Sequence, residues 1–145
     1  MSTIKLFETK QVRSLWDQDK EAWFFSIVDV VSVLTDSVDA AAYWRKLKQR
    51  LKAEGNQTVT DCHGLKMPAP DGKMRLTDVA DTEKILRLVQ SIPSRKAEPF
   101  KQWLARVGNE RIEETDDPEL AFDRAMETYL KKGYSKEWIN QRMTV

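Results

Sequence analysis

Residues 26–52, SIVDVVSVLTDSVDAAAYWRKLKQRLK, form two expected helices of opposite character. The first, Ile27 to Leu34, is apolar on nearly every side, so we expect it to be buried. The second has no acidic residue between Ala40 and Lys52. A short buried helix that leads through a turn into a basic amphipathic helix is the outline of a helix-turn-helix. Nucleic acid is therefore the first partner that the sequence suggests.

The apolar segment is rich in β-branched residues, so a strand is the alternative to a helix. Asp29 and Ser32 lie three positions apart. That spacing places them on one side of a helix, whereas strand alternation would put them on opposite faces. Ser26 can cap such a helix, with Asp29 in the acidic position of a capping box. We therefore predict a helix over 27–34 that is ended by residues 35–37.

The basic segment is predicted to begin at the cap residue Asp39 and to end at Gly55 and Asn56. It carries a core-facing apolar stripe at helical spacing, and the rest of its surface is dominated by positive charge. The stripe consists of Trp44, Leu47 and Leu51, and the basic residues around it are Arg45, Lys46, Lys48, Arg50 and Lys52.

The start of the basic helix argues against base reading. A recognition helix reads bases mostly with its N-terminal residues, which here are Asp39 and three alanines, 40–42. None of them carries the amide or guanidinium group that makes a bidentate contact with a base. We therefore expect the helix to hold backbone phosphates. An alternative source of base contacts is the segment that contains Asn56, Gln57, His63 and Lys66.

The length and composition indicate one domain of ordinary size. Acidic and basic residues are unevenly distributed along the chain. The chain has 145 residues, 41% of them hydrophobic, and a formal net charge of +1. Residues 41–75 carry eight Lys or Arg against three Asp or Glu, whereas residues 1–40 and 113–145 are both net acidic. A basic middle between acidic ends favours an anionic polymer as partner.

Motifs for catalysis, cofactors and membranes are missing from the sequence. No glycine-rich phosphate loop, nucleophile motif or long apolar run is present, and no secretion signal is evident. Cys62 and His63 are the only cysteine and histidine, too few for a closed zinc site. We therefore expect a cytoplasmic, non-enzymatic protein with no metal, no cofactor and no membrane partner.

Short strands are expected on both sides of the two helices. Residues 4–8 and 12–16 alternate between apolar and polar side chains, and residues 22–25 are largely aromatic. The polar residues 17–21 form the natural turn before the third strand. Further strands are expected at TVTDC, residues 58–62, and at KMRLT, residues 73–77, with the turn signal Asp71-Gly72 between them. The fold class is thus α+β, with a small antiparallel sheet packed against several helices.

The remaining chain is predicted to be helical. One helix is expected from Thr77 or Asp78 to Ile92, with Val79 on its apolar stripe. The next begins near Pro99 and carries an apolar face, predicted to be core, of Phe100, Trp103, Leu104 and Val107.

An acidic tract at residues 113–119 is expected to mark a boundary. Two short helices follow it, one from Pro118 to Gly133 and one capped by Ser135. Because they carry few large apolar residues, we expect them to pack on the body, with Trp138 as the anchor.

With these elements placed, the chain resembles the BRO N-terminal family of prophage antirepressors and baculovirus proteins over about residues 5–111. The resemblance rests on WFFSIVDVVSVL, on Tyr43-Trp44-Arg45 and on the spacing S-x-K-A-x-x-F-x-x-W. Ser94, Lys96, Ala97, Phe100 and Trp103 occupy that spacing. The N-terminal part of DNA-damage-inducible protein D looks similar too. The resemblance implies an α+β module without catalytic residues, associated with DNA binding and phage gene regulation.

These observations give two functional hypotheses. The first is a phage-type regulatory module that binds DNA with the five basic helix residues and with Arg95 and Lys96. The second is an antirepressor-like module that binds a repressor or another regulatory protein through the aromatic sheet or the acidic C-terminal helices. The predicted domains are a BRO-like domain at residues 1–112 and a helical extension at residues 113–145 packed on it.

Overall fold

The computed structural model describes residues 12–60 and 62–143. Its contacts divide the chain into two compact units, Met1–Lys101 and Gln102–Val145. The first unit holds the sheet, helices α2 to α5, the 3-10 turn η1 and the start of α6. The second unit holds the rest of α6 with α7 and α8.

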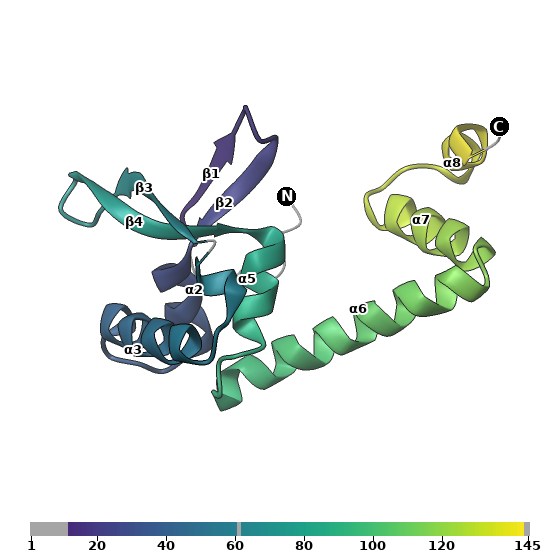
Figure 1. The fold of residues 1–145 in the computed structure, drawn as a ribbon. Coiled ribbons are helices and arrows are strands. Elements are labelled where there is room, and N and C mark those ends of the chain that lie inside the picture. The colour runs from purple at the N-terminus through teal and green to yellow at the C-terminus, as the bar shows by residue number, and fades with distance from the viewer. Residues whose placement is uncertain (1–11, 61, 144–145) are drawn as a thin grey trace. The chain divides into compact units, whose positions relative to one another are not determined.

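Four antiparallel strands form the sheet of the first unit, in the order β1-β2-β4-β3. Figure 1 shows the sheet with helices α2, α3 and α5 on one side of it. This arrangement confirms the predicted α+β class with an antiparallel sheet. The strands are β1 Ser14–Asp17, β2 Ala22–Ser26, β3 His63–Pro68 and β4 Met74–Asp81.

Strands β1 and β2 are joined by the predicted polar turn. The Asp17 carboxylate accepts hydrogen bonds from the backbone N–H groups of Asp19 and Lys20, both at 3.0 Å. Glu21 closes the turn with a positive φ of 49°, a conformation that glycine adopts more readily. The further strand predicted at residues 4–8 lies outside the described residues.

Alternation along strand β2 sends its two phenylalanines to opposite faces of the sheet. Phe25 pairs with Ala80 of β4, and both are buried. Phe24 packs with Met67 and Val79 in a separate buried cluster. Strand β2 is therefore covered on both faces, as its aromatic sequence indicates.

Helix α2, Ile27–Leu34, is buried as predicted, and Ser26 caps it by accepting a hydrogen bond from Asp29 N at 3.3 Å. The predicted capping box is wrong, because the backbone N–H of Ser26 donates to Arg13 O instead. The Asp29 carboxylate binds the Arg13 guanidinium, with contacts of 2.8 and 3.0 Å. Arg13 thereby ties the start of β1 to the start of α2.

The strand predicted at residues 58–62 is wrong, because helix α4, Gln57–Thr60, occupies that segment. The side chain of Val59 is buried, with 1% exposure. Packing of this side chain outweighs the strand propensity of the threonine- and valine-rich sequence. The chain becomes extended only at His63, the first residue of β3.

The helix predicted from Thr77 or Asp78 to Ile92 is also wrong in its first turn. Strand β4 continues through Asp81, with Val79 paired to β2 in the middle of the sheet. Helix α5 is Thr82–Val89, and its cap is Asp81, whose carboxylate accepts from Lys84 N at 3.0 Å. Both aspartates suit a cap by sequence, and the pairing of β4 selects the later one.

Helix α6, Glu98–Asp116, follows η1, Arg95–Ala97. Its predicted core face is confirmed only at its start, where Phe100 is buried, whereas Val107 is 40% exposed. The helix also continues through most of the acidic tract, so the predicted boundary at residue 113 is not a helix end. The break comes at residues 117–118.

The second unit continues with α7, Glu119–Lys131, and α8, Lys136–Met143. Gly133, with a φ of 92°, ends α7, and Ser135 caps α8 by accepting from Trp138 N at 3.2 Å, as predicted. Trp138 is nevertheless 38% exposed, and the fully buried side chain is Ile139. Within its own unit, the Trp138 ring stacks on Tyr134 with 4.3 Å between ring centroids, and its predicted role as the anchor on the first unit stays a prediction. Packing of these helices on the first unit stays a prediction.

Candidate nucleic-acid interface

Helix α3, Ala40–Ala53, is the basic helix predicted from the sequence. The Asp39 carboxylate caps it by accepting from Ala42 N at 3.0 Å. At its end, Gly55 N donates to Lys52 O and Asn56 N to Leu51 O, the paired hydrogen bonds of a Schellman motif. Gly55 has the positive φ, 75°, that this motif requires. Both predicted ends of the helix are confirmed.

The apolar stripe of α3 holds the helix against the first unit. Trp44, Leu47 and Leu51 are each less than 5% exposed. The remaining sides of α3 therefore face outward, and they carry the five predicted basic residues. Arg45, Lys46, Arg50 and Lys52 are exposed, and Lys48 is half-buried.

The basic residues of α3 fall into two groups, because residues four apart share one side of a helix. Lys48 and Lys52 lie on one side, with Arg45 near them. Lys46 and Arg50 lie on the other side. The two groups have different surroundings.

On the first side, Asp78 of strand β4 reaches α3. Its carboxylate accepts a hydrogen bond from Trp44 Nε1 at 2.7 Å and one from Lys48 Nζ at 3.1 Å. Burial raises the pKa of Asp78, but the two hydrogen bonds and the charges of Lys48 and Lys52 outweigh burial and hold the pKa below its usual value. Asp78 therefore stays ionised and neutralises part of this side.

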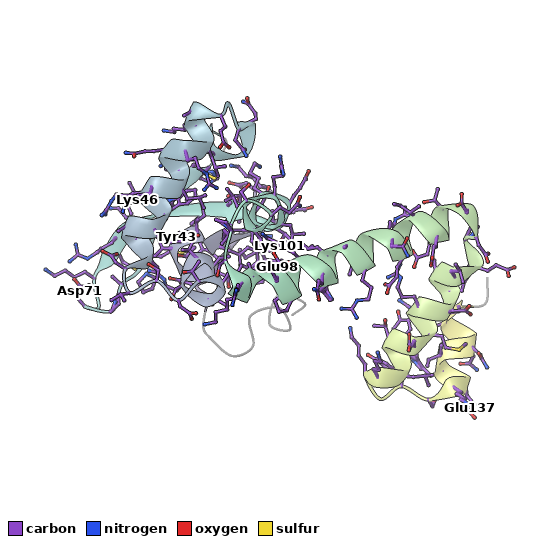
Figure 2. The ribbon with its side chains drawn as sticks, turned by 90° about the horizontal axis from the view of Figure 1, so that it is seen from below. Tyr43, Lys46, Asp71, Glu98, Lys101 and Glu137 are labelled. Carbon is purple, nitrogen blue, oxygen red and sulfur yellow. The ribbon has the colours of Figure 1, made fainter. Side chains whose placement is uncertain are left out.

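On the second side, Arg50 Nη2 donates to the backbone oxygen of Ser91 at 2.9 Å. A hollow of about 260 Å³ lies here, lined by Tyr43, Lys46, Leu47 and Arg50. Figure 2 shows Tyr43 and Lys46 along helix α3. Arg50 Nε also pairs with Glu54 at 3.9 Å, so each side of α3 has one acidic neighbour. Lys46 is the cation of this side that forms no ion pair with a described residue.

The predicted residues Arg95 and Lys96 lie in η1, where Ser94 caps the turn by accepting from Lys96 N at 3.2 Å. Lys96 Nζ pairs with Asp36 at 3.2 Å. This ion pair joins η1 to the link between α2 and α3. It also means that Lys96 has a carboxylate partner, whereas Arg95 is exposed and forms no ion pair within the described chain.

The alternative set of base-reading residues does not form one loop. Gln57 begins helix α4, while His63 and Lys66 belong to strand β3. The His63 ring packs edge-on against Phe24 with 5.0 Å between ring centroids. His63 is thus a packing residue.

Comparison with protein-family models identifies the chain. The model described as BRO family, N-terminal domain, matches residues 11–111. The chain belongs to the BRO family. The matched region contains the whole sheet, helix α3 and η1. It also runs ten residues past the end of the first structural unit, so the boundary predicted at residue 112 stays a prediction.

Neither curated proteins nor solved structures gave a match. The similarity to DNA-damage-inducible protein D therefore stays a prediction. BRO N-terminal domains are regulatory and are not known as enzymes, and the family indicates a phage regulatory, antirepressor-like module.

Within residues 12–60 and 62–143 of the chain, no three His, Cys, Asp or Glu side chains are placed to hold a metal ion. No helix in the same ranges has the length and apolarity needed to cross a membrane. The chemistry that the described surface offers at α3 is electrostatic contact with an anion.

The partners of the predicted cations were not foreseen from the sequence. Asp78 stands 30 residues after Lys48, and Asp36 stands 60 residues before Lys96. Local patterns such as i, i+4 pairing cannot reveal contacts at such separations. Asp78 also matched a helix cap in sequence, so its position beside α3 followed only from the sheet.

Proposed function

We propose that this BRO domain is a phage-type regulatory module that binds DNA through the exposed basic residues on both sides of helix α3. The observation that carries the proposal is the set of cations without an acidic partner. Arg45, Lys46 and Lys52 are exposed and form no ion pair with any described residue. Such cations can neutralise phosphates and release counterions without first losing a carboxylate.

The proposed contacts are to the DNA backbone. The first turn of α3 carries only alanine side chains, 40–42, which offer no hydrogen bond to a base edge. Binding should therefore depend on salt more than on sequence. Lys48 and Lys96 contribute less in this proposal, because each would have to exchange a carboxylate for a phosphate.

The test is a titration of a fluorescent duplex with the full chain at several salt concentrations. The proposal predicts saturable binding at low salt and a slope of log K against log salt near −0.9 for each neutralised phosphate. Lys46→Gln should make the slope less steep by about one unit, for duplexes of any sequence. Lys20→Gln, at the exposed turn of the first hairpin, is the control.

Two results would overturn the DNA-binding proposal. One is the lack of saturable binding at low salt. The other is an equal loss of affinity in Lys46→Gln and Lys20→Gln, because the contact would then not be specific to α3.

We propose as a second candidate an antirepressor-like contact with a regulatory protein. Phe122, Met126 and Leu130 follow one another at four-residue spacing on α7 and are 56, 36 and 40% exposed. An apolar helix stripe of this kind is typical of a protein-binding face. Full-length chain immobilised for capture should retain a regulatory protein from cells, and Phe122→Glu should not. Ile112→Glu, a change at an exposed residue of α6, is the control.

Failure of the wild-type chain to retain any protein would remove the support for this second candidate. Both candidates describe a non-enzymatic regulator, as expected for the family. A cytoplasmic location fits either of them, since both DNA and its regulatory proteins are found there.

A further inference from the structure

A hollow of about 360 Å³ lies in the first unit, away from the residues that line the α3 hollow. It sits where the β1–β2 hairpin meets the first turn of α5. One wall is aromatic and the other is acidic. The lining residues are Trp16, Glu21, Ala22, Trp23, Asp81, Thr82 and Glu83.

The aromatic wall consists of Trp16 and Trp23, which are directly paired across β1 and β2. Their ring centroids are 5.5 Å apart and the planes meet at 63°, so the rings touch edge to face. Trp16 is 43% exposed on β1, the outermost strand of the described sheet on this side. Its Nε1 donates to Gln18 Oε1 at 3.3 Å, while the ring itself stays accessible.

The acidic wall contains three carboxylates in different states. The Asp81 carboxylate already has partners within the fold, because it accepts a hydrogen bond from Lys84 N and forms an ion pair with Lys84 Nζ at 3.1 Å. Glu21 and Glu83 are exposed and form no ion pair with any residue that the structure describes. The hollow therefore combines accessible indole rings with two negative charges that have no counterion among residues 12–60 and 62–143.

We infer that this hollow binds an arginine side chain presented by a partner protein. A guanidinium stacks flat on an indole ring and is attracted by its electron-rich face. Its N–H groups can donate at the same time to two carboxylates, here Glu21 and Glu83. Phosphate-bearing partners are disfavoured, because both free charges of the hollow are negative.

The arginine should belong to a peptide chain. Free arginine carries its own carboxylate, which would be repelled by Glu21 and Glu83. That the arginine comes from a partner protein rests on the second proposed function above. The ability of the hollow to bind a guanidinium is tested separately, with small compounds. Failure to capture a regulatory protein from cells and failure of the hollow to bind the arginine analogue are thus separate results. Neither test contains DNA.

The direct test is a titration of the full ¹⁵N-labelled chain with N-acetyl-arginine amide, followed by the indole N–H signals. The chain has five tryptophans, so Trp138 in the second unit serves as an internal reference. Saturable shifts are expected at Trp16 and Trp23 and not at Trp138. The citrulline analogue has a similar shape without the charge and should cause no shift. The lysine analogue should bind more weakly, because an ammonium cannot stack flat on an indole ring or donate bidentate hydrogen bonds to a carboxylate.

Variants define which wall contributes. Glu21→Gln with Glu83→Gln should weaken arginine binding about tenfold or more, since two charge-assisted hydrogen bonds are lost. Glu137→Gln is the matched control, because Glu137 stands in the first turn of α8 as Glu83 does in α5. Trp16→Phe should reduce binding partly and Trp16→Leu further, in the order of cation attraction to the rings.

Glu21→Gly separates binding from folding, because glycine suits the positive φ of this position. This variant should unfold no more easily than the wild type and still lose arginine affinity. The inference is overturned if Trp16 and Trp23 do not shift, if the citrulline analogue shifts them equally, or if the lysine analogue binds as well as the arginine one. Unchanged binding in the double glutamine variant would also overturn it.

Discussion

The exposed side of helix α3 and the hollow beside Trp16 and Trp23 belong to the same 101-residue unit, yet they carry opposite free charges. Each surface contains both acids and bases. What differs is which of them are already paired inside the fold: Asp78 binds Lys48 at α3, whereas Lys84 binds Asp81 at the hollow. The charges left without a partner decide what each surface can attract.

Strand β4 supplies the internal acid of both surfaces. Asp78 and Asp81 lie three positions apart on this strand, so their side chains leave opposite faces of the sheet. One reaches α3 and the other caps α5. The near-zero net charge of the chain therefore conceals one cationic and one anionic surface. Variants at each surface can test whether the two bind their partners independently.

The largest effect is expected from Leu51→Ala, which removes a fully buried side chain from the inner stripe of α3. A cavity of this kind costs about 2–5 kcal/mol of the free energy of unfolding. Urea denaturation of the full chain measures it. Lys52→Ala, on the outer side of the same helix, should cost less than about 0.5 kcal/mol. Equal costs would mean that the inner stripe does not hold the helix.

A double charge reversal, Arg45→Glu with Lys46→Glu, should weaken duplex binding more than about 100-fold near 0.1 M salt, since each lost phosphate contact is worth about tenfold there. The response of Trp16 and Trp23 to the arginine analogue should be unchanged. Fluorescence anisotropy and the indole signals measure the two surfaces in the same sample. A loss of both responses would contradict their independence.

Lys46→Gln and Lys48→Gln offer a smaller and sharper comparison within α3. Both remove one lysine from the helix, but Lys48 is bound to Asp78 and Lys46 has no acidic partner among the described residues. Duplex affinity should fall about tenfold for Lys46→Gln and clearly less for Lys48→Gln. Equal losses would show that the Asp78 pair opens on binding.

The smallest effect concerns acid stability. Because the pKa of Asp78 is lowered in the folded state, its contribution is present above the unfolded value, about 3.9, and is lost as pH falls through the folded pKa. Asp78→Asn should therefore flatten the loss of unfolding free energy below about pH 4. The side chain is 35% exposed, so solvent limits the difference to about 1 kcal/mol or less. Unfolding curves at pH 3 to 6 measure it, and identical slopes would contradict the lowered pKa.

Local patterns predicted much of the fold. The ends of α3 followed from Asp39 and Gly55, and the buried face followed from the spacing of Trp44, Leu47 and Leu51, because caps and stripes are properties of nearby residues. The class α+β followed from the mixture of alternating and helical segments. These features need no knowledge of distant contacts.

The errors arose where distant contacts override local preference. Residues 58–62 suit a strand by composition but form a helix around buried Val59, and Val79 suits a helix stripe but pairs in the sheet. The same limit applies to the candidate site. The sequence identified the cations of α3, but it could not show that Asp78 neutralises Lys48, nor that Glu21 and Glu83 meet two tryptophans.

We expect DNA to meet helix α3 and not the acidic hollow. The most direct measurement is a titration of the ¹⁵N-labelled full chain with a duplex at low and high salt, observed at every backbone amide and indole. If α3 meets DNA, the shifts should centre on residues 43–53 and weaken as salt rises, while the indole N–H signals of Trp16 and Trp23 should stay unchanged. Shifts centred on the hollow, or α3 amides that do not move at low salt, would contradict it.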